Sequence, residues 1–222
     1  DLADKIQNRR YDNRFKIASF SAGSNITGIR TDVYDIAKMC HRNDCLIFFD
    51  FAAVAPYVEI DMNKDKDSYF DAIYFSPHKF LGGPGSSGIL VFREELYRID
   101  LPPTAAGGGT VDFVGFHSHD FSKDIETREM AGTPPILQTI KAAFAMELKN
   151  KIGVDKIGQI EADFTKDFLS KMKRIPNLEM VGRVDPEEKI PIISFNIKHK
   201  DRILHPKFVT KLLNDLFGIQ SR

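Results

Sequence analysis

Residues 45–50 read Cys45-Leu46-Ile47-Phe48-Phe49-Asp50, which is five apolar residues followed by a carboxylate. A continuous apolar run of this length is typical of a strand buried on both faces, as in a parallel sheet. The carboxyl ends of such strands are where α/β sheets bind ligands. A desolvated carboxylate needs a partner, so Asp50 is a candidate for binding a ligand cation. The alternative is an ordinary turn residue at the end of a strand.

Further strand-like segments flank this run. Residues 16–20, 72–75 and 89–92 each have the length and composition of a strand. Ahead of Cys45 we expect a helix that is capped by Thr31. Its first turn carries Asp32, and its apolar face comprises Val33, Ile36, Ala37 and Cys40. This alternation of strands and helices predicts an α/β fold with a mostly parallel sheet.

The second half of the chain shows helical periodicity. Two helices are predicted, at residues 134–151 and 154–172. Their apolar faces comprise Leu137, Ile140, Ala143, Phe144 and Leu148 in the first helix, and Ile157, Ile160, Phe164 and Phe168 in the second. Strands are expected at residues 178–181 and 190–197. A last helix is expected at residues 206–216, with Gly218 as its C-terminal stop.

The length of 222 residues allows one large or two small domains. Because the pattern changes from alternating α/β to α+β, we place a boundary near residue 150. We therefore predict that residues 1–150 form part of a large domain and that residues 151–222 form part of a smaller C-terminal subdomain.

The composition is that of a globular protein, with 42% hydrophobic residues and 31 basic against 31 acidic side chains. These values exclude a disordered chain and argue against a broadly basic nucleic-acid-binding protein. The sequence has neither an apolar run of 18 residues nor a signal-peptide pattern, so no membrane partner is expected. Two cysteines favour a reducing compartment, so we expect a cytoplasmic location, with a mitochondrion or another organelle as alternatives.

A lysine follows the strand at residues 72–75, within Ser76-Pro77-His78-Lys79-Phe80-Leu81-Gly82-Gly83-Pro84. A lysine among apolar and aromatic neighbours can act as a Schiff-base nucleophile, so Lys79 is a candidate catalytic residue. Ser76 and His78 could donate hydrogen bonds to a phosphate group nearby. The alternative is a solvated lysine in a turn.

Three other motifs are weak. The glycine-rich residues 82–88 lack the G-K-[ST] ending of a Walker A motif, so a nucleotide-binding module is disfavoured. His117, His119 and Asp120 form a non-specific pattern, and we expect no metal site there. Cys40 and Cys45 are interpreted as packing thiols.

Three segments, taken together, resemble the class V aminotransferase family. They are residues 50–53, residues 76–84, and residues 131–134, which read Ala-Gly-Thr-Pro. The members of this family are fold-type I enzymes that depend on pyridoxal phosphate. The branch that the chain resembles most comprises the cysteine desulfurases and selenocysteine lyases. The resemblance runs from about Ser19 to Arg222, and its most specific part is the S-x-H-K motif with the glycines that follow it.

The resemblance implies a set of roles for individual residues. Lys79 would form the aldimine (Schiff base) with pyridoxal phosphate and later act as the general base at the substrate α-carbon. Asp50 would pair with the ring nitrogen, and Asn25 would bind the ring hydroxyl. The cofactor phosphate would be bound by Ser76 and His78 and, from the partner subunit of a homodimer, by Thr133. Arg222 would bind the carboxylate of a small amino-acid substrate.

The chain also departs from the family pattern. Ala53 stands where the family has a glutamine that contacts the ring hydroxyl. The resemblance begins in mid-domain, and the desulfurase cysteine loop would lie beyond Arg222. We therefore expect a piece of a larger enzyme, truncated at both ends and inactive alone. The sequence does not distinguish between desulfurase, lyase and aminotransferase activities. The alternative to an enzyme is a non-catalytic α/β homologue or fragment that does not bind pyridoxal phosphate.

Overall fold

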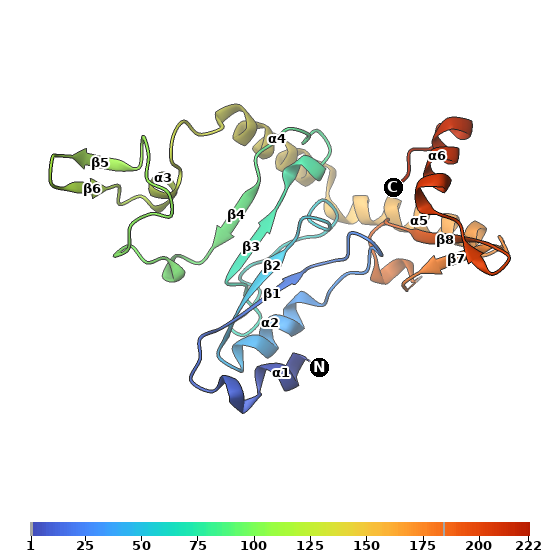
Figure 1. Cartoon of the computed structure of the whole chain (residues 1–222), viewed down its shortest axis with the longest axis horizontal. Helices are drawn as coiled ribbons and strands as arrows, with labels where there is room; N and C mark the ends of the chain where they lie inside the picture. The colour runs from blue at the N-terminus through green and yellow to red at the C-terminus, as the bar shows by residue number, and fades with distance from the viewer. Residues whose placement is uncertain (1, 184) are drawn as a thin grey trace.

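The computed structural model describes residues 2–183 and 185–222 and has a four-stranded sheet at its centre (Figure 1). The strands lie in the order β1 (Lys16–Ser21), β2 (Cys45–Asp50), β3 (Ala72–Phe75) and β4 (Ile89–Phe92). The first three strands are parallel, and β4 is antiparallel to β3. The expected α/β fold with a mostly parallel sheet is thereby confirmed.

Strand β2 lies between two parallel neighbours, and its two faces differ in burial. Cys45, Ile47 and Phe49 are buried, whereas the alternate side chains are only half-buried. The expectation of full burial on both faces is therefore wrong for one face. The register sets Asp50 opposite Ser21 of β1 and Tyr74 of β3.

Helix α2 (Val33–His41) packs against β2, and its Ala37 and Cys40 belong to the same buried cluster as Ile47. Its N-cap is Asp32, whose side chain accepts a hydrogen bond from the Asp35 amide at 3.4 Å. Thr31 was the expected cap, and that expectation is wrong. The Thr31 hydroxyl donates instead to the carbonyl oxygen of Ser21 at 2.7 Å, which ties the start of α2 to the end of β1.

Shorter elements complete the first half of the chain. Near the N-terminus lie α1 (Leu2–Ile6) and the 3-10 turn η1 (Arg9–Tyr11). The turn η2 (Pro77–Lys79) follows β3, and η3 (Glu94–Leu96) follows β4.

A hairpin that we did not expect extends away from the central sheet (Figure 1). It consists of β5 (Val111–Val114) and β6 (His119–Phe121) and is followed by α3 (Ile125–Glu129). Arg128 is buried at its base and donates to the carbonyl oxygens of Ser122 and Ile99. One side chain thereby joins the hairpin to the loop after β4.

The two long helices are confirmed as α4 (Ile136–Ile152) and α5 (Val154–Met172). Their expected apolar faces lie outward, because Leu137 is 77% exposed and Phe164 is 70% exposed. The side chains that these helices bury are Ala142, Ala145, Thr165, Leu169 and Met172. The two alanines are short, so α4 can approach η2 closely.

The last part of the chain forms an antiparallel sheet of β7 (Leu178–Val181), β8 (Ser194–His199) and β9 (Arg202–Ile203). The turn η4 (Pro186–Glu188) precedes β8, and α6 (Pro206–Phe217) closes the chain. As expected, α6 ends at Gly218, whose φ is 65°. None of the helices within the described residues is long and apolar enough to cross a bilayer.

The strand expected at residues 190–197 begins only at Ser194. Residues 190–192 pack instead against the loop after β1, where the Ile190 amide donates to the carbonyl oxygen of Gly28 at 2.9 Å. The Arg30 amide likewise donates to Glu188, also at 2.9 Å. The two parts of the chain are therefore hydrogen-bonded at this loop.

Candidate functional site

A pocket of about 530 Å³ opens at the carboxyl ends of β1 and β2. Its lining includes Asn25 from the loop after β1, Asp50 at the end of β2 and Lys79 from the turn after β3. Parallel strands present their carboxyl ends at the same edge, and this explains why residues far apart in the sequence meet there. Three of the predicted site residues are thus brought together.

Asp50 is the last residue of β2, and its side chain is half-buried. One carboxylate oxygen, Oδ1, accepts a hydrogen bond from the Ala52 amide at 2.7 Å. Among the described residues, no cationic side chain forms an ion pair with this carboxylate. Asp50 therefore shapes a turn through one oxygen and leaves the other for a ligand that carries a proton or a positive charge.

Asn25 lies in a loop that its neighbours hold in one conformation. The Ser24 hydroxyl accepts from the amides of Ile26 and Thr27 at 3.2 and 3.0 Å. Gly28 has a φ of 76°, and a Cβ atom there would lie 2.7 Å from the carbonyl oxygen of Ile192. A glycine is therefore required where this loop meets the second half of the chain.

Lys79 ends the turn η2, and its side chain is exposed. Its neighbours Pro77 and Phe80 are buried. The apolar environment that we expected for the Lys79 side chain therefore surrounds these two neighbours and not the lysine itself. The Lys79 amide donates to the Ser76 carbonyl oxygen at 3.1 Å, and the Phe80 amide donates to Pro77 at 2.9 Å. The backbone around Lys79 is thus fixed, while its amine is free to reach a ligand.

The remaining predicted residues lie outside this pocket. Ser76 and His78 adjoin Lys79 in the chain but do not line the pocket, and the Ser76 side chain forms no capping bond. Thr133 is exposed in the loop before α4. Arg222 lines a neighbouring pocket of about 770 Å³, to which Asn25 also contributes. Asn25 therefore lines both the pocket of Arg222 and the pocket of Asp50 and Lys79.

The sequence analysis missed the hydroxyl groups of the pocket, which are those of Ser21, Ser24, Thr27 and Thr31. We expected Thr31 only as a helix cap and gave no role to Ser21, Ser24 or Thr27. The available signal was the position of the serine-rich residues 21–25 directly after a strand, at the same sheet edge as Asp50.

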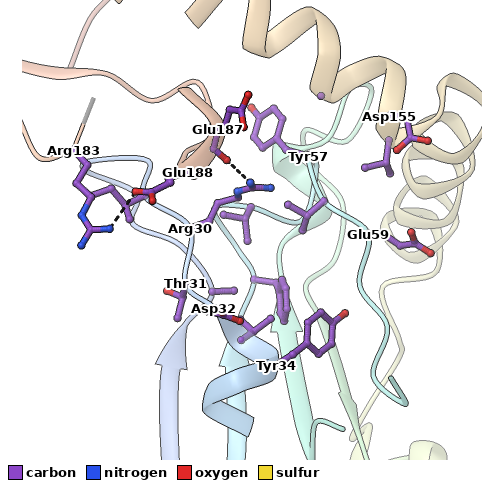
Figure 2. A pocket seen from close by; sticks show the side chains of 18 residues that line it. Arg30, Thr31, Asp32, Tyr34, Tyr57, Glu59, Asp155, Arg183, Glu187 and Glu188 are labelled. Carbon is purple, nitrogen blue, oxygen red and sulfur yellow. Dashed lines mark hydrogen bonds and ion pairs between the residues drawn. The ribbon is translucent and has the colours of Figure 1, made fainter. Parts of the chain in front are cut away.

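A larger cavity of about 890 Å³ is lined in part by residues 29–34, which form the end of the loop after β1 and the start of α2 (Figure 2). Arg30 points into it and donates to the backbone oxygen of Glu187, and Arg183 pairs with Glu188 at 3.1 Å. Burial, together with nearby Glu161, raises the pKa of Tyr57 in its wall. None of the predicted site residues lines this cavity.

Metal ligation has no support within the part of the chain that the structure describes, because no group of three or more His, Cys, Asp or Glu side chains is placed to hold an ion. Both cysteines are buried and free. Burial, reinforced by Cys45, raises the pKa of the Cys40 thiol to about 12. A buried thiol of this kind is a poor nucleophile, which is consistent with packing roles for both cysteines.

Comparison with known proteins gives a consistent result. The sequence profile described as Aminotransferase class-V matches residues 3–222. A probable cysteine desulfurase from Streptomyces coelicolor is 31% identical over 200 residues, which are 90% of this chain and 46% of that protein. One from Staphylococcus aureus is 31% identical over 207 residues, which are 93% of this chain and 47% of that protein.

Two solved structures with a similar fold are described as cysteine desulfurases. The apo enzyme from Thermococcus onnurineus has a TM-score of 0.79 at 25% identity, and the match covers 100% of this chain and 52% of that one. An enzyme from Escherichia coli has a TM-score of 0.74 at 22% identity and shows the same fold over 94% of this chain and 49% of that one. The chain spans about half the length of the curated relatives that it matches.

Proposed function

This chain belongs to the class V aminotransferase family, and on that premise we propose that it carries the pyridoxal-phosphate site of an enzyme acting on a small amino acid. The relatives named above are cysteine desulfurases, which makes an activity of that kind the leading candidate. The single observation that carries the proposal is the meeting of Asn25, Asp50 and Lys79 in one pocket.

The residues of the pocket fit this cofactor by their chemistry. Asp50 has a carboxylate oxygen that its turn does not use, and a protonated pyridine nitrogen would supply the missing partner. Lys79 offers an exposed primary amine that the cofactor aldehyde can bind covalently. Asn25 offers an amide that can bind the ring hydroxyl, and four hydroxyl side chains line the same space.

The mechanism assigns these residues distinct tasks. When bound, pyridoxal phosphate supplies an electron sink for carbanion chemistry at the substrate α-carbon. Asp50 would hold the ring nitrogen protonated, and Asn25 would orient the ring. Lys79 would take or return the proton at the substrate α-carbon, because this residue lines the pocket from an exposed position on a fixed turn.

Other roles stay predictions that the neighbouring geometry supports less directly. Arg222 as a substrate-carboxylate residue is supported by the pocket that it shares with Asn25. Ser76 and His78 as phosphate ligands are supported by their place beside Lys79 in η2. Thr133 as a ligand of the partner subunit's cofactor would require a homodimer, and its exposure is compatible with that.

Sulfur transfer would need a nucleophilic cysteine. Cys40 and Cys45 are buried on and beside α2, so neither is suited to accept sulfur. We therefore assign to this chain cofactor binding and proton transfer at the α-carbon. The division into residues 1–150 and 151–222 and the cytoplasmic location are likewise retained as predictions.

The test is covalent labelling of the protein with pyridoxal phosphate. We expect a visible absorption band on adding the cofactor. After borohydride reduction, peptide mass spectrometry should find the pyridoxyl group on Lys79. Lys79→Ala should lose both signals, whereas Lys66→Ala, which changes an exposed lysine that does not line the pocket, should keep them. The absence of a band, or labelling spread evenly over surface lysines, would favour the alternative of a protein that does not bind the cofactor.

A further inference from the structure

One lysine of α4 contacts both segments that supply charged groups to the candidate site. The Nζ atom of Lys149 donates to the carbonyl oxygens of Ala55 and Val58, each at 2.6 Å. The same Nζ lies 5.6 Å from the centre of the Phe80 ring, over its face. Lys149 itself does not line the pocket that holds Asp50 and Lys79.

The carbonyl contacts fix the turn that begins immediately after Asp50. Within this turn, the amides of Val54 and Ala55 both donate to the carbonyl oxygen of Phe51, at 3.0 and 2.8 Å. The Phe51 amide in turn donates to Tyr74 of β3 at 2.9 Å. Because Ala55 and Val58 are both held by Lys149, the backbone that follows Asp50 is tied to α4 as well as to the sheet.

The aromatic contact fixes the residue that follows Lys79. Phe80 is 5% exposed and stacks on Phe75 of β3 with ring centres 6.0 Å apart. The face of an aromatic ring attracts a cation, so the Lys149 ammonium group stabilises the Phe80 ring in this position. Helix α4 also packs directly against η2, and its Ala145 lies in the main buried cluster.

The position of Lys149 has an electrostatic cost. Burial lowers the pKa of its amine, and Glu59 acts in the opposite direction. Within the described residues, no carboxylate forms an ion pair with Lys149. Backbone carbonyls and an aromatic face therefore replace the water that a surface lysine would keep.

We propose that Lys149 is a positioning residue that sets the separation between the Asp50 carboxylate and the Lys79 amine by holding both of their segments on α4. This inference rests on the proposed function of the pocket. It goes beyond that function because it assigns a role to a residue that touches neither the pocket nor any expected position of the cofactor.

The experiment compares Lys149→Met with Lys149→Arg and with Lys151→Met. Methionine keeps much of the side-chain volume but removes the donors, whereas arginine keeps a charge and several donors. Lys151 lies on the same helix but is exposed and pairs with Glu147, so it is the matched control. Two quantities are measured in the full chain: hydrogen exchange without cofactor, and the affinity for pyridoxal phosphate from the visible band.

We expect Lys149→Met to speed amide exchange about tenfold in both residues 51–58 and residues 77–83. It should also weaken cofactor binding at least about tenfold and shift the position of the visible band. Lys149→Arg should recover most of the affinity, and Lys151→Met should match the wild type. If Lys149→Met fails to fold, the comparison of Lys149→Arg with Lys151→Met decides, because arginine cannot place both donors identically and should still shift the band.

Faster exchange in only one segment, or unchanged cofactor affinity and band position in a folded Lys149→Met protein, would overturn the positioning role and leave the proposed function intact. A wild-type protein that gives no cofactor band would instead overturn the proposed function, and the positioning role with it.

Discussion

A Cβ atom added to Gly83 would lie 1.8 Å from the carbonyl oxygen of Pro77. The chain therefore folds back on the first residue of η2 just after it has passed Lys79, and the Gly83 amide donates to Phe80 at 2.9 Å to close this turn. No side chain fits at that approach, so the second glycine of the motif is a requirement of backbone geometry.

Replacing Gly83 with alanine should displace the Lys79 turn. We expect a loss of at least about 2 kcal/mol in the free energy of unfolding, because a backbone atom and not a flexible side chain must move. Gly88→Ala is the control, since its nearest atom would lie 4.0 Å away, at ordinary contact distance. Urea denaturation of both variants gives the comparison, and equal stabilities would contradict the packing described.

Asp50→Asn should keep the turn after β2, because the amide oxygen can still accept from Ala52. It should lower the affinity for pyridoxal phosphate about tenfold, since the neutral side chain no longer favours a protonated ring nitrogen. Asp61→Asn is matched in geometry, because Asp61 accepts from the Asn63 amide at 2.9 Å in an exposed turn. A titration of the visible band should separate the two variants, and equal affinities would argue against the role of Asp50.

Asp71→Ala should be strongly destabilising. The Asp71 side chain is 3% exposed, and its Oδ2 contacts both the Ile47 amide at 2.8 Å and His41 Nε2 at 2.9 Å. Its removal leaves buried groups unpaired, and we expect a loss of about 3 kcal/mol. Asp167→Ala, which breaks the exposed pair with Lys171, should cost less than about 0.5 kcal/mol. Thermal unfolding of both variants tests the contrast, and a similar small loss in each would refute it.

The stability should also fall in alkaline solution through Cys40. Its pKa is raised to about 12 in the folded chain, whereas the pKa of an unfolded thiol is about 8.5. The stabilisation of the folded chain by the neutral Cys40 thiol is therefore fully present below about pH 8.5. It declines by about 1.4 kcal/mol per pH unit as the pH rises toward the pKa of the folded state. Cys40→Ala should flatten the decline between about pH 9 and 11 in urea titrations. Parallel curves for wild type and variant would show that another group is responsible.

The sequence predicts those features of the structure that follow from general rules, and it fails for features that depend on contacts between residues far apart in the sequence. The meeting of Asn25, Asp50 and Lys79 follows from a general rule about strand ends, so it could be anticipated. The hairpin of β5 and β6 could not, because contacts of Arg128 with distant carbonyl groups hold its base.

The errors in detail have similar causes. Helical spacing located α4 correctly, but it could not show that Ala142 and Ala145 would be buried while Leu137 faces outward. The Thr31 hydroxyl does not cap α2, because it donates instead to the Ser21 carbonyl oxygen at the end of β1. The strand that begins at Ser194 is shorter than its apolar run because residues 190–192 bind the loop at Gly28. Each of these outcomes is decided by a partner far away in the sequence.

The antiparallel direction of β4 has a consequence for how this protein could be altered. Phe75 pairs with Ile89, so the connection that carries Lys79 leaves the sheet and returns to it at neighbouring points. Its span is fixed by two strands that are already hydrogen-bonded, so any inserted residue must bulge out of the connection, and an insertion beside Lys79 would displace the lysine. Residues 105–106 are exposed and do not connect two strands that pair with each other. Tags or insertions are therefore best placed there, and natural length variation should concentrate there as well.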